Sequence, residues 1–322
     1  MKYQQRVTPA RPADGPLLRR GAGGEVSMMI SLILFSFLLF SASSAQVLEG
    51  TSNTLSIKVG NDPVEEIAAR QKAEMVETLA SLGITKVPKY YALIIGVSDY
   101  QNAGAGLPNL EMPVKDAEKL YSVLTRKYAF DPQNVTFLKS PTREEILTQF
   151  DRLAETVTDK ENLLIFYAGH GVYDKNKDFG YWLPSDAKIP SRSDWIANST
   201  IKDYVGAIKS RHTLLITDAC FGGSIFKTRS VTTTLMRFNE VYKNNSRKAL
   251  TSGNLSEVPD KSVFLKYLLK TLEDNTDVFL PASALFARIY EPILNNASTT
   301  PQFGIVQGAG DEGGDFVFIK KD

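Results

Sequence analysis

Two short segments of the sequence combine a nucleophile with a base. Cys220, the only cysteine of the chain, stands in RHTLLITDACFGG after an apolar run and before a glycine pair. His170 stands in LLIFYAGHG, after another apolar run and between two glycines. The thiolate is the reactive form of cysteine, and an ordinary thiol is mostly protonated at neutral pH. Because an imidazole can take that proton and return one to a leaving amine, the pair predicts acyl transfer.

The remaining residues of these types leave few other assignments. The chain has two histidines, and His212 begins the apolar run that leads to Cys220, so it is expected at the opposite end of that strand. One cysteine excludes an intrachain disulfide, and with two histidines it cannot form a conventional zinc cluster. Taken singly, Cys220 is also typical of a buried apolar thiol and His170 of a loop residue. Their joint occurrence at two strand ends favours the dyad.

The elements that must position the pair alternate along the chain. Apolar runs at 90–97, 162–168 and 212–217 predict strands buried on both faces, and weaker patterns predict strands at 134–138, 247–252 and 315–319. Helical patterns occupy 112–127, 142–156, 199–209 (begun by Ser199 or Thr200), 261–273 and 282–295. This alternation predicts an α/β fold with a doubly wound, mainly parallel sheet and helices on both faces. In such sheets the site lies beyond the carboxyl ends of the strands.

The N-terminal region has a different character. An apolar segment at 28–40 is shorter than the roughly 20 residues of a membrane span but fits the core of a signal peptide. Arg19 and Arg20 precede it, and Ser43 and Ala45 form a small-x-small pattern before Gln46. We expect cleavage after Ala45, with an uncleaved membrane anchor as the alternative. Either arrangement exports the rest of the chain, as a periplasmic, secreted or anchored protein.

The chain is therefore divided into three parts. Residues 1–45 are expected to form an N-terminal extension with the signal peptide or anchor. Residues 46–87 are expected to form a linker and a helical arm, which Asp62 caps and Pro63 begins. Residues 88–322 are expected to form the catalytic domain.

At these motifs the chain resembles the caspase and metacaspase family of cysteine peptidases. The resemblance covers about residues 89–273 and rests on YYALIIGVSDY, VKDAEKL, LLIFYAGHG and LLITDACFGG, in the order and spacing of the family. It implies a caspase-like α/β/α sandwich in which His170 is the general base and Cys220 the nucleophile. It also implies an oxyanion hole formed by the backbone N–H groups of Gly171 and Cys220.

Some positions depart from the family pattern. Ala168 stands where a serine is common before Gly-His-Gly, and Lys115 replaces a frequent asparagine. The residues at 221–223 also differ from those that usually follow the nucleophile. No catalytic group is removed. The sequence implies no cofactor, and it leaves stimulation by calcium and substrate preference open.

Two acids suggest which side chain precedes the cleaved bond. The resemblance to metacaspases implies that Asp116, in VKDAEKL, and Asp218, two residues before Cys220, line the pocket for that side chain. Two carboxylates in a partly dry pocket favour Arg or Lys and repel Asp. The alternatives are a helix-start charge for Asp116 and a turn-forming acid for Asp218. Ser252, followed by Gly253, is expected to supply an edge that pairs with an extended peptide.

The predicted function is that of an exported cysteine endopeptidase that cuts polypeptides after Arg or Lys. A formal net charge of +1 gives no indication of a nucleic-acid partner, and only the N-terminal segment, if uncleaved, would contact a membrane. The alternatives are a catalytically silent caspase-fold binding or scaffold module, and another acyl-transfer enzyme. The basic residues at 224–248, predicted to be a long exposed loop, suggest self-processing there.

Overall fold

The computed structural model describes residues 63–174, 176–219, 226–229, 238–253 and 261–321. Within them a seven-stranded sheet has the order β2-β1-β3-β7-β9-β11-β8. Its strands are β1 (Tyr90–Gly96), β2 (Phe130–Lys139), β3 (Asn162–Ala168), β7 (His212–Asp218), β8 (Phe226–Arg229), β9 (Ser246–Thr251) and β11 (Gln302–Val306). The five strands from β2 to β9 are parallel, whereas β11 and β8 are antiparallel to their neighbours. The predicted fold class, a mainly parallel α/β sheet, is confirmed.

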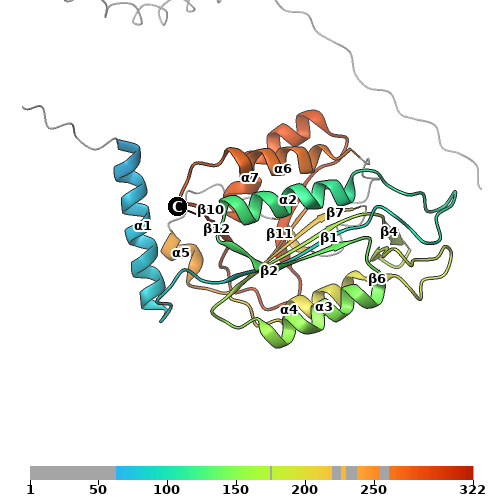
Figure 1. Cartoon of the computed structure of the whole chain (residues 1–322), viewed down its shortest axis with the longest axis horizontal. Coiled ribbons are helices and arrows are strands. Elements are labelled where there is room, and N and C mark those ends of the chain that lie inside the picture. The colour runs from blue at the N-terminus through green and yellow to red at the C-terminus, as the bar shows by residue number, and fades with distance from the viewer. Residues whose placement is uncertain (1–62, 175, 220–225, 230–237, 254–260, 322) are drawn as a thin grey trace, which may run out of the picture. The chain divides into compact units, whose positions relative to one another are not determined.

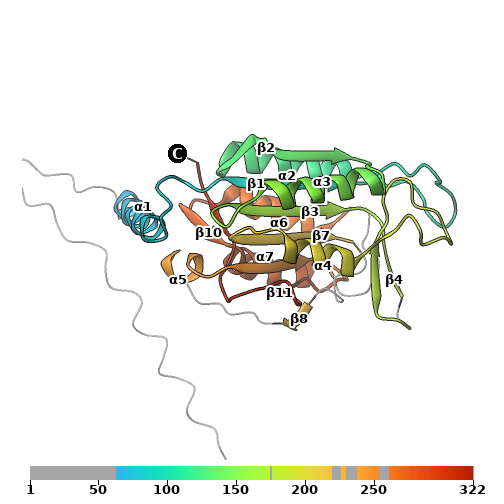
Figure 2. The same cartoon turned by 90° about the horizontal axis from the view of Figure 1, so that it is seen from below.

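Helices cover both faces of this sheet. They are α1 (Pro63–Ser81), α2 (Pro113–Lys127), α3 (Arg143–Thr156), α4 (Asn198–Ala207), α5 (Phe238–Tyr242), α6 (Val263–Asp274) and α7 (Ala282–Asn296). Figures 1 and 2 show α2, α6 and α7 on one face and α3 and α4 on the other. Alternate residues of β1 enter separate cores, with Ile94 on the α2 side and Ile95 on the α3 side. This two-sided burial explains the continuous apolar runs in the middle of β1, β3 and β7.

Side-chain caps determine where two of these helices begin. Thr142 accepts a hydrogen bond from the backbone N–H of Glu145, whose carboxylate accepts one from the backbone N–H of Thr142. Ser262 caps α6 by accepting from the backbone N–H of Leu265 at 3.1 Å. The expected cap of α4 was wrong, because that helix begins at Asn198 with no side-chain bond at its N-cap.

The helical arm expected after Pro63 is present as α1. Its residues Met75 and Leu79 are buried in the same core cluster as the α2 face of the sheet, and α1 packs against α5. The predicted cap Asp62, the signal peptide and the linker lie outside the described residues, so the three-part division of the chain stays a prediction. No helix within the described ranges is both long and apolar enough to span a membrane.

Several strands were not expected from the sequence. A small sheet consists of β4 (Gly171–Asp174), β5 (Phe179–Trp182) and β6 (Ile196–Ala197). The predicted closing strand forms as β12 (Val317–Ile319), but it pairs with β10 (Phe279–Pro281) instead of joining the main sheet. Strand β11 was missed, and it extends the main sheet beyond β9.

The prediction of one long exposed loop at 224–248 was wrong. This segment contains β8, α5 and the start of β9. Phe238 and Tyr242 of α5 are fully buried, and their rings stack 4.7 Å apart. The Tyr242 ring also meets the edge of His212 at the start of β7. Aromatic burial of this kind stabilises a helix of five residues, which is too short to stand alone in water.

Candidate active site

Two neighbouring strands end side by side at one edge of the sheet. Strands β3 and β7 are parallel, and Ala168 pairs with Asp218 in their register. His170 therefore follows β3 at the same edge at which Cys220 follows β7. Asp218 and Ala219 are buried, whereas Cys220 lies outside the described residues. The dyad thus stays a prediction, with its strands in the arrangement that the sequence led us to expect.

The ring of His170 is oriented by a backbone carbonyl. Its Nε2 atom lies 2.8 Å from the carbonyl oxygen of Pro108. A carbonyl oxygen only accepts hydrogen bonds, so Nε2 carries the proton in this geometry. In the neutral ring Nδ1 is then the nitrogen that accepts a proton, as a general base must. The sequence contained no signal for Pro108, because any residue can supply a carbonyl.

Two tyrosines hold the backbone of His170. The Tyr100 hydroxyl accepts a hydrogen bond from the His170 N–H at 2.8 Å, and the Tyr167 hydroxyl donates one to the His170 carbonyl at 2.7 Å. The rings of Tyr100 and His170 also lie 5.0 Å apart. Tyr167 was expected only as a core residue, and Tyr100 was not singled out. A hydroxyl near the end of an apolar strand was the signal that could have found Tyr167.

Gly169 lies where these groups converge. Its φ angle is +156°, and a Cβ atom there would lie 3.0 Å from the Tyr167 hydroxyl and 3.1 Å from the Tyr100 hydroxyl. A side chain would therefore push on both tyrosines that hold His170. Gly169 therefore leaves room for the tyrosine hydroxyls that hold His170. Gly171 begins β4 and pairs with Trp182, while its place in an oxyanion hole stays a prediction.

The two predicted pocket acids are both buried and interact electrostatically. Asp116, in the first turn of α2, is 6 % exposed, and its Oδ1 accepts a hydrogen bond from Lys119 Nζ at 2.8 Å. Asp218, at the end of β7, is 7 % exposed, and its Oδ1 has no hydrogen-bond partner among the described residues. Burial raises the pKa of Asp218 to about 6; the hydroxyls of Ser252 and Ser262 oppose this shift, and the charge of Asp116 adds to it.

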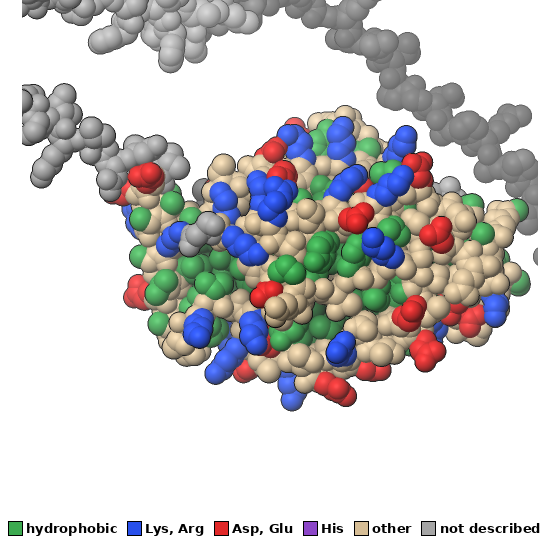
Figure 3. Space-filling model, viewed as in Figure 1, with side chains coloured by type: hydrophobic (Ala, Val, Ile, Leu, Met, Phe, Trp, Pro, Cys, Tyr) green, Lys and Arg blue, Asp and Glu red, His purple; other side chains and the backbone are tan. Residues whose placement is uncertain are grey.

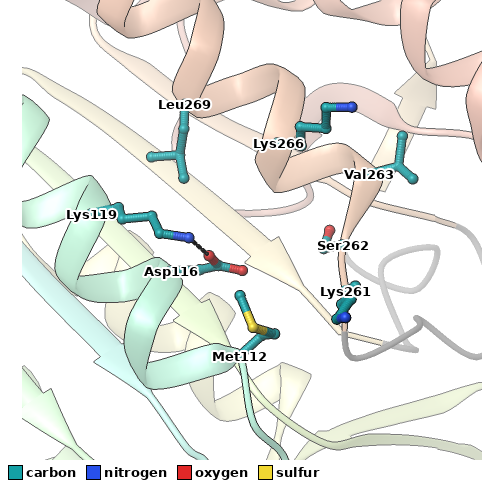
Figure 4. A pocket seen from close by; sticks show the side chains of 8 residues that line it. All are labelled: Met112, Asp116, Lys119, Lys261, Ser262, Val263, Lys266 and Leu269. Atoms are coloured by element: carbon teal, nitrogen blue, oxygen red, sulfur yellow. Dashed lines mark hydrogen bonds and ion pairs between the residues drawn. The ribbon is translucent and has the colours of Figure 1, made fainter.

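A cavity of about 480 Å³ lies between α2 and α6. Its polar lining consists of Asp116, Lys119, Lys261, Ser262 and Lys266. Figure 4 shows Asp116 and Lys119 reaching in from α2, opposite Ser262 at the start of α6. Since Ser262 also influences the pKa of Asp218, the cavity lies close to the end of β7. The three lysines were not expected from the sequence, because they are brought together by the packing of the two helices.

Ser252 follows β9 and is 1 % exposed. Its backbone N–H donates to the carbonyl of Thr217 at 3.1 Å, and its hydroxyl has no hydrogen-bond partner among the described residues. The N–H group is therefore already used within the sheet. Pairing with an extended peptide at Ser252, which stays a prediction, would have to use other backbone groups.

His212 is excluded as the base by its position. It begins β7, at the opposite end of the strand from Asp218, and is fully buried. Its ring nitrogens lie 3.0 Å from the Ser246 hydroxyl and 3.2 Å from the Tyr242 carbonyl. Burial is the main cause that lowers the pKa of His212 to about 3. The ring is therefore neutral at physiological pH and has a structural role.

A family model for the caspase domain matches residues 89–290, which is more than half of the chain. The chain belongs to the caspase-domain family. This membership supports a cysteine-peptidase activity in general. The matched range of this caspase-domain protein includes His170 and Cys220, as well as the acids Asp116 and Asp218 and the serine Ser252.

Solved structures resemble this caspase-domain protein at low sequence identity. A protein from Geobacter sulfurreducens is 16 % identical, with a TM-score of 0.49, and the match covers 70 % of this chain and 97 % of that one. Caspase-1 from Spodoptera frugiperda is 17 % identical, with a TM-score of 0.48, and the match covers 69 % of this chain and 92 % of that one. Among curated proteins, none matches the sequence.

Proposed function

We propose that this caspase-domain protein is an exported cysteine endopeptidase that hydrolyses polypeptides after Arg or Lys. The observation that carries the proposal is the contact between His170 Nε2 and the Pro108 carbonyl, which leaves Nδ1 as the basic nitrogen. Structural histidines such as His212 are buried and lie far from the edge where the strands end. His170 instead follows a strand that is next to the one leading to Cys220.

The proposed reaction needs no group beyond the chain and water. His170 Nδ1 takes the thiol proton of Cys220, and the thiolate attacks the carbonyl carbon of the peptide bond. The backbone N–H groups of Gly171 and Cys220 stabilise the negative charge on the carbonyl oxygen. His170 then protonates the leaving amine, and water hydrolyses the thioester to release the acid and regenerate the thiol.

The preference for a basic side chain rests on Asp116 and Asp218. Both carboxylates are buried near the end of β7, and Asp116 also lines the neighbouring cavity together with Lys119, Lys261 and Lys266. An aspartate side chain placed between Asp116 and Asp218 would meet two like charges, which is costly where water is partly excluded. A guanidinium or ammonium group would give Asp218 the partner that its Oδ1 lacks among the described residues.

A peptide library and a thiol probe test the proposal. The purified chain should cleave after Arg or Lys, and an electrophilic probe should label Cys220 in the wild type but not in His170→Ala. His212→Gln is the matched control, because it removes the other imidazole and should leave labelling intact. Cleavage after Asp in preference to Arg would refute the pocket assignment. Labelling that does not depend on His170, with no cleavage of any peptide, would favour the silent scaffold.

Export is a separate part of the proposal. The apolar segment at 28–40 and the small residues before Gln46 support a cleaved signal peptide. N-terminal sequencing of the protein recovered outside the cytoplasm should begin at Gln46. A cytoplasmic chain with an intact N-terminus would contradict export. No cofactor is proposed, and the same peptidase assay with calcium or with a chelator measures any stimulation by calcium.

Self-processing is proposed only at exposed basic residues. Arg247 is an unsuitable site, because it lies buried in β9 and its guanidinium donates hydrogen bonds to backbone carbonyls. Lys243, between α5 and β9, is exposed. The intact mass of the purified wild type should show fragments that Cys220→Ala lacks. Identical single chains would exclude self-processing.

A further inference from the structure

We propose that Lys119 is a tethered cation that competes with a basic substrate side chain for Asp116 and thereby sets the affinity of the pocket. The proposal rests on the preference for Arg or Lys stated above. It assigns a specificity-determining role to Lys119, a residue to which the sequence analysis gave no function. The ammonium group of Lys119 occupies the same carboxylate that the substrate cation must reach.

The two partners differ in how firmly they are held. Lys119 and Asp116 are three residues apart on α2, and their ion pair spans 2.8 Å. The Asp116 side chain is 8 % exposed, whereas the Lys119 side chain is 56 % exposed. The acid is therefore confined. Within the described residues the Lys119 ammonium makes no hydrogen bond or ion pair except the one with Asp116, so it can turn into water by breaking that contact alone. Ion pairs with one solvated partner are weak, so an incoming cation can replace it.

The surroundings of the pair strengthen the competition. Lys261 and Lys266 line the same cavity and are exposed. Figure 3 shows Lys and Arg side chains gathered over α2 and α6 on this face of the molecule. A substrate cation that enters while Lys119 is still bound meets three ammonium groups around a single lining carboxylate. Displacement of Lys119 removes one of these charges and frees Asp116 in the same step.

The lysines also provide a matched control. Lys266 lines the cavity from α6 and has the same charge as Lys119, but the ion pair with Asp116 is made by Lys119. Lys119→Gln and Lys266→Gln each remove one positive charge from the lining. If Lys119 competes directly for Asp116, Lys119→Gln increases the affinity for a cationic ligand more than Lys266→Gln does. If only the total charge matters, the two variants behave alike.

Agmatine, a small guanidinium compound, serves as the probe. Its binding to the full chain carrying Cys220→Ala is measured by calorimetry, so the assay does not depend on turnover. Lys119→Gln should bind agmatine about fivefold more tightly, because a partly exposed ion pair with Asp116 that competes with agmatine is lost. Lys266→Gln should change the affinity for agmatine less than about twofold. Lys119→Arg should restore the weak binding of the parent, because it replaces the cation.

The outcomes separate this inference from the proposed function. Equal affinities of the parent and Lys119→Gln, equal gains in both Gln variants, or no agmatine binding by any chain would each overturn the competition. In the active chain, Lys119→Gln should lower KM for Arg peptides and leave kcat unchanged. If no chain cleaves after Arg or Lys while the agmatine pattern holds, the proposed peptidase specificity fails and the competition stands.

Discussion

Replacing Asp218 by Asn should stabilise the fold at neutral pH and weaken turnover of basic substrates. Asp218 is 7 % exposed, and its Oδ1 has no hydrogen-bond partner among the described residues. Burial raises its pKa from 3.8 to about 6, so the ionised form is less stable in the folded protein than in the unfolded chain. A neutral side chain of the same shape removes that penalty together with the charge that would attract an arginine.

The size of this stability difference follows from the pKa shift of Asp218. A difference of about two pKa units at about 1.4 kcal/mol each corresponds to about 3 kcal/mol. At pH 4 the folded carboxyl is protonated and the unfolded one is about half ionised, so only about 0.5 kcal/mol of the penalty is present. As pH rises from 4 to 6 the unfolded chain loses its proton first, so the folded wild type loses relative stability. The advantage of Asp218→Asn at pH 7 should therefore exceed its advantage at pH 4 by about 2.5 kcal/mol.

Urea unfolding at pH 4 and pH 7, with Cys220→Ala in every chain, measures this difference. Asp315→Asn is the matched control, because burial also raises the pKa of Asp315 to about 6. Asp315 differs in accepting hydrogen bonds from the backbone N–H and the hydroxyl of Ser283 and from the N–H of Phe316. Its replacement should show a similar pH dependence but should destabilise the protein at pH 4, where these bonds are lost without any relief of charge.

Two results would refute this reasoning. If the stability difference between Asp218→Asn and its parent is the same at pH 4 and pH 7, burial does not control the ionisation of Asp218. If the chain with Cys220 intact and Asp218→Asn cleaves Arg peptides with unchanged kcat/KM, the carboxylate is not part of the substrate pocket. Activity is best expressed as the kcat/KM for Arg peptides divided by the kcat/KM for Ala peptides, since ionisation of the catalytic dyad affects both values equally.

Three further predictions concern the two histidines. Gly169→Ala should lower kcat by about a hundredfold, because its Cβ would push on the tyrosine hydroxyls that hold His170. A loss of kcat under threefold would contradict this reason. Tyr100→Phe should reduce kcat severalfold and leave KM unchanged in steady-state assays, because it removes a hydrogen bond to His170; an effect on KM alone would be inconsistent. Burial lowers the pKa of His212 to about 3, so the wild type should lose stability as pH falls from about 6.5 toward 3, when the unfolded imidazole gains a proton first. Unfolding curves of His212→Gln should show a smaller acid loss, and an identical loss would rule out this cause.

Much of the fold was predictable because local patterns and chain order are enough to specify it. Apolar runs bounded by polar turns predicted the parallel strands β1, β3 and β7, whose bounds agree closely with the structure. Helices between them require neighbouring strands to run in the same direction, so the residues after β3 and β7 had to reach one edge of the sheet. His170 and the approach to Cys220 were therefore placed by the sequence pattern alone.

Tertiary packing decided how the side chains at that edge are held. The Pro108 carbonyl reaches His170 across 62 residues, and the Tyr100 hydroxyl reaches it across 70. Such contacts leave no periodic trace in the sequence, because backbone carbonyls are common to all residues and Tyr100 lies in a loop after β1, where no pattern indicates its partner. The antiparallel strands β8 and β11 were missed because they are short and contain polar residues or glycine, as in FKTR and QFGIV, which interrupt the apolar pattern. The approach of α2 to α6 placed Lys119 and Lys266 around one cavity, and only that packing brings their charges close to Asp116.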